Sequence, residues 1–300
     1  MSFRIPFTPA SSLASGLHVL AALGGSPPHP FQIDTGSVGI LVPRSVLGPA
    51  FQNFDPSKDI TFGFISSGNH YHGQWVDVPV VIGVPEAWDG AGEFPTAVVE
   101  VFAVDQPADF SGGMLGIGFA IEKDANGGAN RNPFLHLTQA GENLAPSYII
   151  REEGIDVGLE QIAFDVFALV PLIRNAHDDD WLQPTGILGL AETFSVDLPL
   201  LMDTGIQEML VFLPMQDRPA TLASFSSLPD GVAVSVSVPV SRGGHALAYR
   251  FVTGDADEAM APSTVQWRPN GHGINTGRNV LAGVDYLFDA AGGQVGFRTR

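Results

Sequence analysis

The chain contains no cysteine among its 300 residues. Disulfides and thiolate-bound metals are therefore excluded, and the composition is compatible with a reducing compartment. Basic residues are also scarce, since 14 Lys and Arg stand against 32 Asp and Glu, a formal net charge of −18. Nucleic acids and anionic membranes attract basic surfaces, so this charge argues against both as partners.

Long hydrophobic runs are missing as well, and no segment approaches the length of a membrane span. A short apolar stretch lies between Leu13 and Leu23, but His18 interrupts it and no clear cleavage site follows. We interpret residues 17–23 as the first strand rather than as part of a signal peptide. We therefore expect a cytoplasmic protein without a leader.

Short β-branched segments dominate what is present. Residues 78–82, 97–104 and 232–238 are predicted strands, and the last alternates between apolar and polar residues as a half-buried strand does. Helical signals are few, with candidates at residues 132–139 and 279–286. The sequence predicts an all-β protein with a few short helices, in two lobes at residues 1–150 and 151–300.

Two Asp-Thr-Gly triplets stand out, one in each half of the chain. Each follows an apolar segment, residues 31–33 before the first and residues 200–202 before the second. A carboxylate on a tight turn at the end of a buried strand is costly unless something uses it. The repetition suggests a duplicated lobe, with one Asp from each half meeting at the interface. The triplets are Asp34-Thr35-Gly36 and Asp203-Thr204-Gly205.

The segments around both triplets resemble pepsin-like aspartic peptidases. Residues 31–43 and 200–205 are similar to the two active-site segments of that family. Residues 113–118, Gly-Met-Leu-Gly-Ile-Gly, resemble the apolar-apolar-Gly segment that crosses under the first active-site loop. Residues 286–297 resemble the closing hairpin. The resemblance covers nearly the whole chain in the right order.

This resemblance implies a bilobed acid-protease fold whose two lobes each resemble a six-stranded barrel. It implies an aspartic endopeptidase in which Asp34 and Asp203 share one proton and activate a water in the cleft between the lobes. We expect a monomer that binds a peptide or small-molecule substrate and needs no metal or cofactor. The resemblance also implies supporting residues, which are threonines that link the two loops and glycines that bring backbone N–H groups near the carboxylates: Thr35, Thr204, Gly36 and Gly205.

Two positions depart from the family pattern. Ser37 follows the first triplet, where the family has a hydroxyl that donates to the outer carboxylate oxygen. Ile206 stands at the matching position of the second, so Asp203 should lack this donor and ionise less readily than Asp34. In the second half we place the apolar-apolar-Gly segment at residues 277–283, with Ala282 in place of the glycine.

Residues 59–76 predict a flap hairpin that turns at Gly68-Asn69. Phe62 then lies opposite Trp75, and Ser66 opposite Tyr71. Side-chain alternation places four aromatic residues on one face, either over a substrate or simply packing the hairpin. Tyr71 is a candidate for the flap hydroxyl. The four aromatic residues are Phe62, Phe64, Tyr71 and Trp75.

His70 and His72 lie on the opposite face of this hairpin. Such a pair can bind a metal, but the spacing offers no third ligand, so a solvated strand face is the simpler interpretation.

Two further functions stay open. The carboxylate pair could carry out acid–base chemistry on a small molecule, such as an isomerisation or a cyclisation. Ile206, the unusual flap and the lack of a recognisable prosegment favour that alternative. The protein could also be an inactive homologue that only holds a peptide. Retention of both Asp34 and Asp203 argues against that, because a binding module has no need of two crowded carboxylates.

Overall fold

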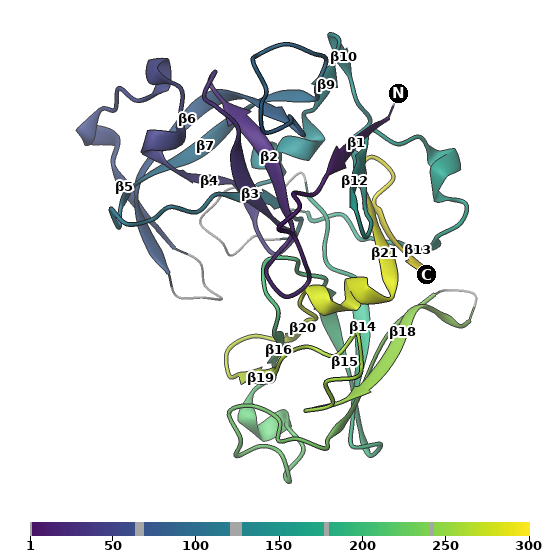
Figure 1. Cartoon of the computed structure of the whole chain (residues 1–300). Coiled ribbons are helices and arrows are strands. Elements are labelled where there is room, and N and C mark those ends of the chain that lie inside the picture. Colours follow the sequence, from purple (N-terminus) through teal and green to yellow (C-terminus); the bar gives the residue numbers. More distant parts are fainter. Residues whose placement is uncertain (1, 64–68, 121–127, 177–179, 241–242) are drawn as a thin grey trace. The chain divides into compact units, whose positions relative to one another are not determined.

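The computed structural model describes residues 2–63, 69–120, 128–176, 180–240 and 243–300. Strands make up 45% of the structure and helical turns 9%, and no helix in the described ranges reaches seven residues. The all-β prediction is confirmed (Figure 1). No helix of the described residues is long and apolar enough to span a membrane.

The chain divides into two compact units. Unit 1 contains residues 1–148, 153–160 and 175–180, and unit 2 contains residues 149–152, 161–174 and 181–300. The division is not a single cut, because short segments between residues 149 and 180 alternate between the two units. Each unit is described below by itself.

Six strands of unit 1 close into a barrel. Around it the order is β6-β2-β3-β8-β4-β7, and β7 pairs with β6 over most of its length to close the ring. The barrel strands are β2 (His18–Leu23), β3 (His29–Asp34), β4 (Val38–Pro43), β6 (His70–Ile82), β7 (Thr96–Gln106) and β8 (Met114–Ile117). Their inward side chains, including Phe31, Ile33 and Val101, are fully buried and form the core of this unit.

Shorter strands flank the barrel. β5 (Ile60–Gly63) pairs with β6, and β9 (Thr138–Gln139) pairs with both β7 and β10 (Glu142–Asn143). β1 (Phe3–Pro6) pairs with β12 (Gly154–Val157) in the same unit.

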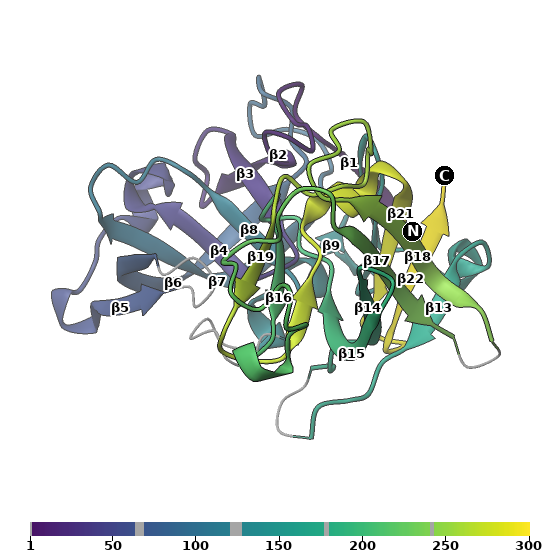
Figure 2. The ribbon, with the colours of Figure 1, turned by 90° about the horizontal axis from the view of Figure 1, so that it is seen from below.

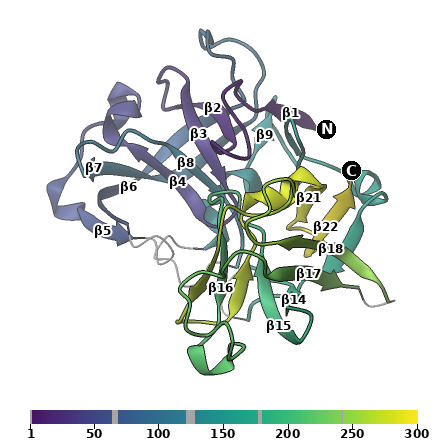
Figure 3. The ribbon, with the colours of Figure 1, turned by 60° about the horizontal axis from the view of Figure 1, so that its bottom comes forward.

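Unit 2 contains a seven-stranded sheet with the order β18-β17-β14-β15-β20-β16-β19 (Figures 2 and 3). Its strands are β14 (Thr185–Leu190), β15 (Phe194–Leu201), β16 (Met209–Phe212), β17 (Ala233–Pro239), β18 (His245–Val252), β19 (Val265–Arg268) and β20 (Gly273–Asn275). Three more strands of this unit pair in the order β21-β22-β13. They are β13 (Ala168–Pro171), β21 (Val284–Asp289) and β22 (Gln294–Thr299), while β11 (Ser147–Ile150) begins in unit 1 and ends in unit 2.

The two units repeat one strand arrangement. The barrel order β6-β2-β3-β8-β4-β7 corresponds to β17-β14-β15-β20-β16-β19. Successive neighbours are antiparallel, antiparallel, parallel, antiparallel and parallel in both units. Matching strands also occur in the same order along the chain, with β5 and β18 as the additions. Such a correspondence is what two copies of one ancestral lobe produce.

The expected strands at residues 17–23, 78–82, 97–104 and 232–238 are confirmed as β2, parts of β6 and β7, and β17. Residues 17–23 are not the first strand, however, because β1 precedes them. The alternation of the last segment buries Val234, Val236 and Val238 on one face. The predicted closing hairpin is present as β21 and β22.

Both helix predictions are wrong beyond a single turn. Asn132 caps a three-residue turn by accepting a hydrogen bond from the Phe134 N–H at 2.9 Å. The chain then enters β9 at Thr138, because that residue pairs with Thr96. Residues 279–286 are likewise divided between a turn and β21. The 3-10 turns are η1 (Arg44–Val46), η2 (Pro49–Phe51), η3 (Pro56–Lys58), η4 (Ala129–Arg131), η5 (Pro133–Leu135), η6 (Gln161–Phe164), η7 (Met215–Asp217) and η8 (Arg278–Ala282).

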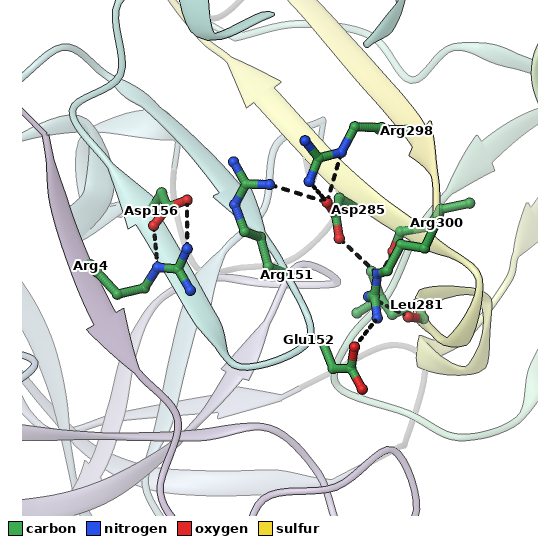
Figure 4. A network of polar contacts seen from close by, with 9 residues as sticks. Arg4, Arg151, Glu152, Asp156, Leu281, Asp285, Arg298 and Arg300 are labelled. Atoms are coloured by element: carbon green, nitrogen blue, oxygen red, sulfur yellow. Dashed lines mark hydrogen bonds and ion pairs between the residues drawn. The ribbon is translucent and has the colours of Figure 1, made fainter. Parts of the chain in front are cut away.

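Unit 2 also holds a cluster of arginines around one buried carboxylate (Figure 4). Asp285 on β21 accepts hydrogen bonds from Arg151 at 3.2 Å, from Arg298, and from Arg300 at 2.8 Å. Arg300 also donates to the carbonyl oxygens of Leu281 and Val284. With three cationic partners the buried charge of Asp285 is well compensated, and the end of β22 is fixed to β21.

Candidate functional site: two aspartate turns

The first turn begins where β3 ends. Asp34 is the last residue of β3 and is 7% exposed. Its Oδ1 accepts the Gly36 N–H at 2.7 Å, and its Oδ2 accepts the Ser37 hydroxyl at 2.6 Å. The hydrogen bond expected from Ser37 is therefore present. Both carboxylate oxygens of this buried side chain therefore have a hydrogen-bond donor.

Strand β8 packs against this turn, which explains the glycines at residues 116 and 118. β8 pairs with both β3 and β4, and the Gly118 N–H donates to the Ser37 carbonyl at 2.8 Å. A Cβ on Gly118 would lie 2.2 Å from the Thr35 carbonyl oxygen, so any side chain would displace the turn. Asn132 and Tyr148 donate to the Ile117 carbonyl at 2.9 Å and fix this crossing segment.

The second turn has the same local geometry. Asp203 follows the end of β15 and is 5% exposed. Its Oδ1 accepts the Gly205 N–H at 2.7 Å, as in the first turn. Thr35 and Thr204, the threonines of the two triplets, are both buried.

Ile206 offers Asp203 no hydroxyl, as expected, but another residue supplies a donor to the outer oxygen. Asn275, the last residue of β20, donates from Nδ2 to Asp203 Oδ2 at 2.6 Å. The Asn275 Oδ1 accepts the Gly277 N–H at 3.0 Å. Because this second bond requires an acceptor, it fixes the amide with its nitrogen toward the carboxylate.

The placement of the crossing segment at residues 277–283 is also wrong. The strand that matches β8 is β20, residues 273–275, which runs parallel to β15 and antiparallel to β16. Gly277 follows it with φ +64°, and a Cβ there would lie 2.4 Å from the Glu208 carbonyl. This glycine makes the close approach that Gly116 makes in unit 1. The sequence pattern missed this glycine because the two residues before it, Asn275 and Thr276, are polar, whereas the family pattern has two apolar residues there.

The register shows how the two turns differ. Leu201 pairs with Asn275 just as Gln32 pairs with Met114, so Asn275 takes the place of Met114. In unit 1 the Ser37 hydroxyl lies 3.8 Å from the Met114 sulfur. The two units therefore place the donor on opposite segments. In unit 1 the donor Ser37 is in the aspartate turn and the apolar Met114 is on the crossing strand. In unit 2 the apolar Ile206 is in the turn and the donor Asn275 is on the crossing strand.

A buried cation accompanies the second turn. Arg278, at the start of η8, is 7% exposed and donates from Nη1 to the Thr204 carbonyl at 3.5 Å. Burial lowers the pKa of the Arg278 guanidinium, and the negative charges of Glu208 and Asp203 raise it. The matching stretch of unit 1, Ile117-Gly118, carries no charge.

The predicted register of the flap hairpin is wrong. Phe62 pairs with Tyr71 rather than with Trp75, and Ile60 pairs with Gly73. Because Gly63 pairs with His70, this register does not fit a two-residue turn at Gly68-Asn69, and residues 64–68 lie outside the described residues. A bulge at His72 and Gly73 further shifts the pairing of β6 with β7. The side chain of Phe62, and all of Phe64 and Ser66, lie outside the described residues.

Tyr71 and Trp75 contact the same buried cluster, Leu41, Phe102 and Val104, in agreement with the predicted shared face. Phe110 and Met114 also pack there, with the Tyr71 and Phe110 rings 5.1 Å apart. Burial raises the pKa of Tyr71, and a hydrogen bond with the Asn69 side chain lowers it. Since Met114 also contacts Ser37, this partly exposed apolar surface adjoins the first aspartate turn.

His72 lies near the acidic residue Asp59. Its Nε2 is 3.8 Å from Asp59 Oδ2, and its side chain is 43% exposed. Within the described ranges no group of three His, Cys, Asp or Glu side chains could hold a metal ion.

No protein-family model matches the chain, and a search of curated proteins finds no match. Functional interpretation therefore depends on the two turns and their strands.

Proposed function

We propose that this protein is an aspartic endopeptidase with a bilobed, pepsin-like fold, in which Asp34 and Asp203 form the catalytic pair. One observation carries the proposal. The same six-strand arrangement occurs in both units, and in both an Asp-Thr-Gly turn lies at the end of the matching strand, β3 or β15. In each turn the glycine N–H binds the aspartate Oδ1 at 2.7 Å.

The chemistry needs one carboxylate from each lobe. Two carboxylates a few ångströms apart do not both ionise, so they share a proton over a range of acidic pH. The ionised member takes a proton from a bound water, and the protonated member donates to the scissile carbonyl oxygen. The water attacks the carbonyl carbon directly, so no covalent bond to the enzyme forms. The tetrahedral diol collapses when its C–N bond breaks, with the leaving nitrogen taking the proton that the first carboxylate accepted from water and the second carboxylate recovering its proton from a diol hydroxyl. Thr35 and Thr204 would link the two turns in this arrangement, as the resemblance implies.

The apolar surface beside the first turn suits a hydrophobic side chain of the substrate. Tyr71, Phe110 and Met114 are each partly exposed, and Met114 contacts the Ser37 hydroxyl that binds Asp34. A peptide with an aromatic or aliphatic residue next to the scissile bond would bury that residue here. We therefore expect cleavage to favour bonds flanked by large apolar residues.

The test is mass spectrometry of a diverse peptide library, incubated between pH 3 and pH 7 with wild type and variants. Wild type should cleave at acidic pH, and Asp34→Asn and Asp203→Asn should each lose activity by about 10³-fold, as removal of an acid–base group does. Asp197→Asn is the matched control, because Asp197 is exposed on β15 and should leave cleavage unchanged.

Full cleavage by Asp34→Asn would overturn the proposal. If wild type leaves every peptide intact at every pH, the same carboxylate pair would instead be assigned to acid–base chemistry on a small molecule.

A further inference from the structure

The two aspartates differ in what surrounds them. Asp34 is bound by one backbone N–H and one hydroxyl. Asp203 accepts hydrogen bonds from the Gly205 N–H and the Asn275 amide, and it also lies within the electrostatic influence of a buried guanidinium. We propose that Asn275 and Arg278 hold Asp203 as the ionised member of the carboxylate pair, so that Asp203 accepts the proton of the water and Asp34 carries the shared proton. The assignment of roles rests on the proposed function, whereas the ionisation itself does not.

Asn275 acts through a short, oriented hydrogen bond. Its Nδ2 lies 2.6 Å from Asp203 Oδ2, and the Gly277 N–H at its Oδ1 prevents the amide from turning its oxygen to the carboxylate. An amide N–H can only donate, so it favours the ionised acceptor. A hydroxyl such as that of Ser37 can donate or accept, so it tolerates a protonated Asp34.

Arg278 adds a full positive charge where water is largely excluded. Its guanidinium donates to the carbonyl oxygen of Thr204, the residue that follows Asp203. In such a site the interaction between opposite charges is stronger than in water. Arg278 stays protonated because a guanidinium deprotonates only at very high pH.

Among the described residues, two other charged groups belong to this cluster with Asp203: Arg278, which begins η8, and Glu208, which precedes β16. Glu208 is half-buried and offsets part of the Arg278 charge. Arg278 interacts with both Asp203 and Glu208. Its backbone N–H donates to the Ile206 carbonyl at 3.0 Å, which fixes the residue beside the second turn.

The experiment titrates each carboxylate alone by NMR of protein labelled with ¹³C at the aspartate carboxyl carbons. Asp203 is followed in an Asp34→Asn background and Asp34 in an Asp203→Asn background, so that the two titrations do not couple. The Asp203 resonance should have its midpoint at lower pH than the Asp34 resonance. Arg278→Met and Asn275→Leu, each in the Asp34→Asn background, should raise the Asp203 midpoint by about one pH unit or more.

Two rescue variants separate this role from a purely structural one. Arg278→Lys keeps the charge and should keep the Asp203 midpoint low. Ile206→Thr, added to Asn275→Leu, supplies a hydroxyl from the position that Ser37 occupies in unit 1, and should bring the midpoint back down. Ser37→Ala is the matched control, since it should raise only the Asp34 midpoint in its own background.

An Asp203 midpoint at or above that of Asp34 overturns the proposal, and this comparison needs neither Arg278→Met nor Asn275→Leu to fold. Unchanged midpoints in folded Arg278→Met and Asn275→Leu also overturn it. Failure of the peptide-library test would refute the peptidase function and leave this titration result standing, so the two outcomes are distinguishable.

Discussion

His29 shows how one side chain can make the fold sensitive to acid. It begins β3, and its ring meets the Phe31 ring edge-on at 5.4 Å. Its Nε2 is buried and has no hydrogen-bond partner among the described residues. Burial lowers the pKa of His29 below the ordinary value of 6.5. The folded protein therefore accommodates the neutral ring better than the charged one.

The sign of the pH effect follows from this shift. Between the lowered pKa of the folded state and the ordinary value of 6.5, the unfolded chain binds more protons, so the free energy of unfolding falls as pH drops through this range. We expect His29→Phe to reduce the loss of thermal stability between pH 7.5 and pH 5. His245→Phe is the matched control, because His245 is exposed on β18. An identical pH dependence in wild type and His29→Phe would contradict the prediction.

The residue scale is also where sequence reasoning reached its limit. Asp34, Gly36 and Ser37 lie within four residues of one another, so their hydrogen bonds could be expected from this short segment and its resemblance to the family pattern. The donor to Asp203 is 72 residues away in sequence, and only strand pairing brings it near. The residues that flank Asn275 in the sequence do not distinguish it from an ordinary polar residue at a strand end.

At the scale of elements, the crossing strand β8 limits which residues can follow it. The Cβ of an alanine at position 118 would meet the backbone of Thr35 at 2.2 Å, and backbone atoms cannot move aside as a flexible side chain can. At Gly112, in contrast, the nearest atom is a Phe110 ring carbon at 3.7 Å, an ordinary contact.

We therefore expect Gly118→Ala to lower the free energy of unfolding by about 2 kcal/mol or more, the usual cost of overpacking. Gly112→Ala should change it by less than about 0.5 kcal/mol, as surface substitutions do. Urea denaturation of the two variants beside wild type measures both values. Equal stability of the two alanine variants would refute the proposed close approach.

Strand existence was easier to predict than strand register. The segments within β6, β7 and β17 were found because β-branched residues and bounding turn residues mark them in the sequence, and the segment in β17 also alternates with period two. The pairing of β5 with β6 was missed because the prediction assumed a two-residue turn, whereas β5 ends at Gly63 and β6 starts at His70. A bulge adds a further shift that no local pattern encodes.

At the scale of the whole molecule, excess negative charge opposes the folded state. The chain has a formal net charge of −18, with only 14 Lys and Arg. Arg151, Arg298 and Arg300 are used together around Asp285 (Figure 4). Few basic side chains are left to balance the remaining acids, so self-repulsion among exposed carboxylates should destabilise the protein at neutral pH.

Salt should relieve this repulsion. We expect the midpoint of thermal unfolding at pH 7 to rise when NaCl is increased from about 10 mM to about 150 mM, because the screening length shortens to roughly 8 Å. The same measurement near pH 4.5, where positive and negative charges balance, is the control and should show little effect of salt. A midpoint that falls with salt at pH 7 would show that attractive ion pairs outweigh the repulsion.

The exchange of donor between Ser37 and Asn275 makes the two aspartate loops non-interchangeable. A transplant of the first loop into the second half would introduce a serine at position 206 while the Asn275 amide stays on β20. The outer oxygen of Asp203 would then face a second donor that its own turn does not have, and the reverse transplant would leave the Asp34 oxygen beside a thioether with no hydroxyl to bind it. Each loop can be exchanged successfully only together with its own crossing strand, so the minimal unit for engineering this scaffold is a pair of segments distant in sequence.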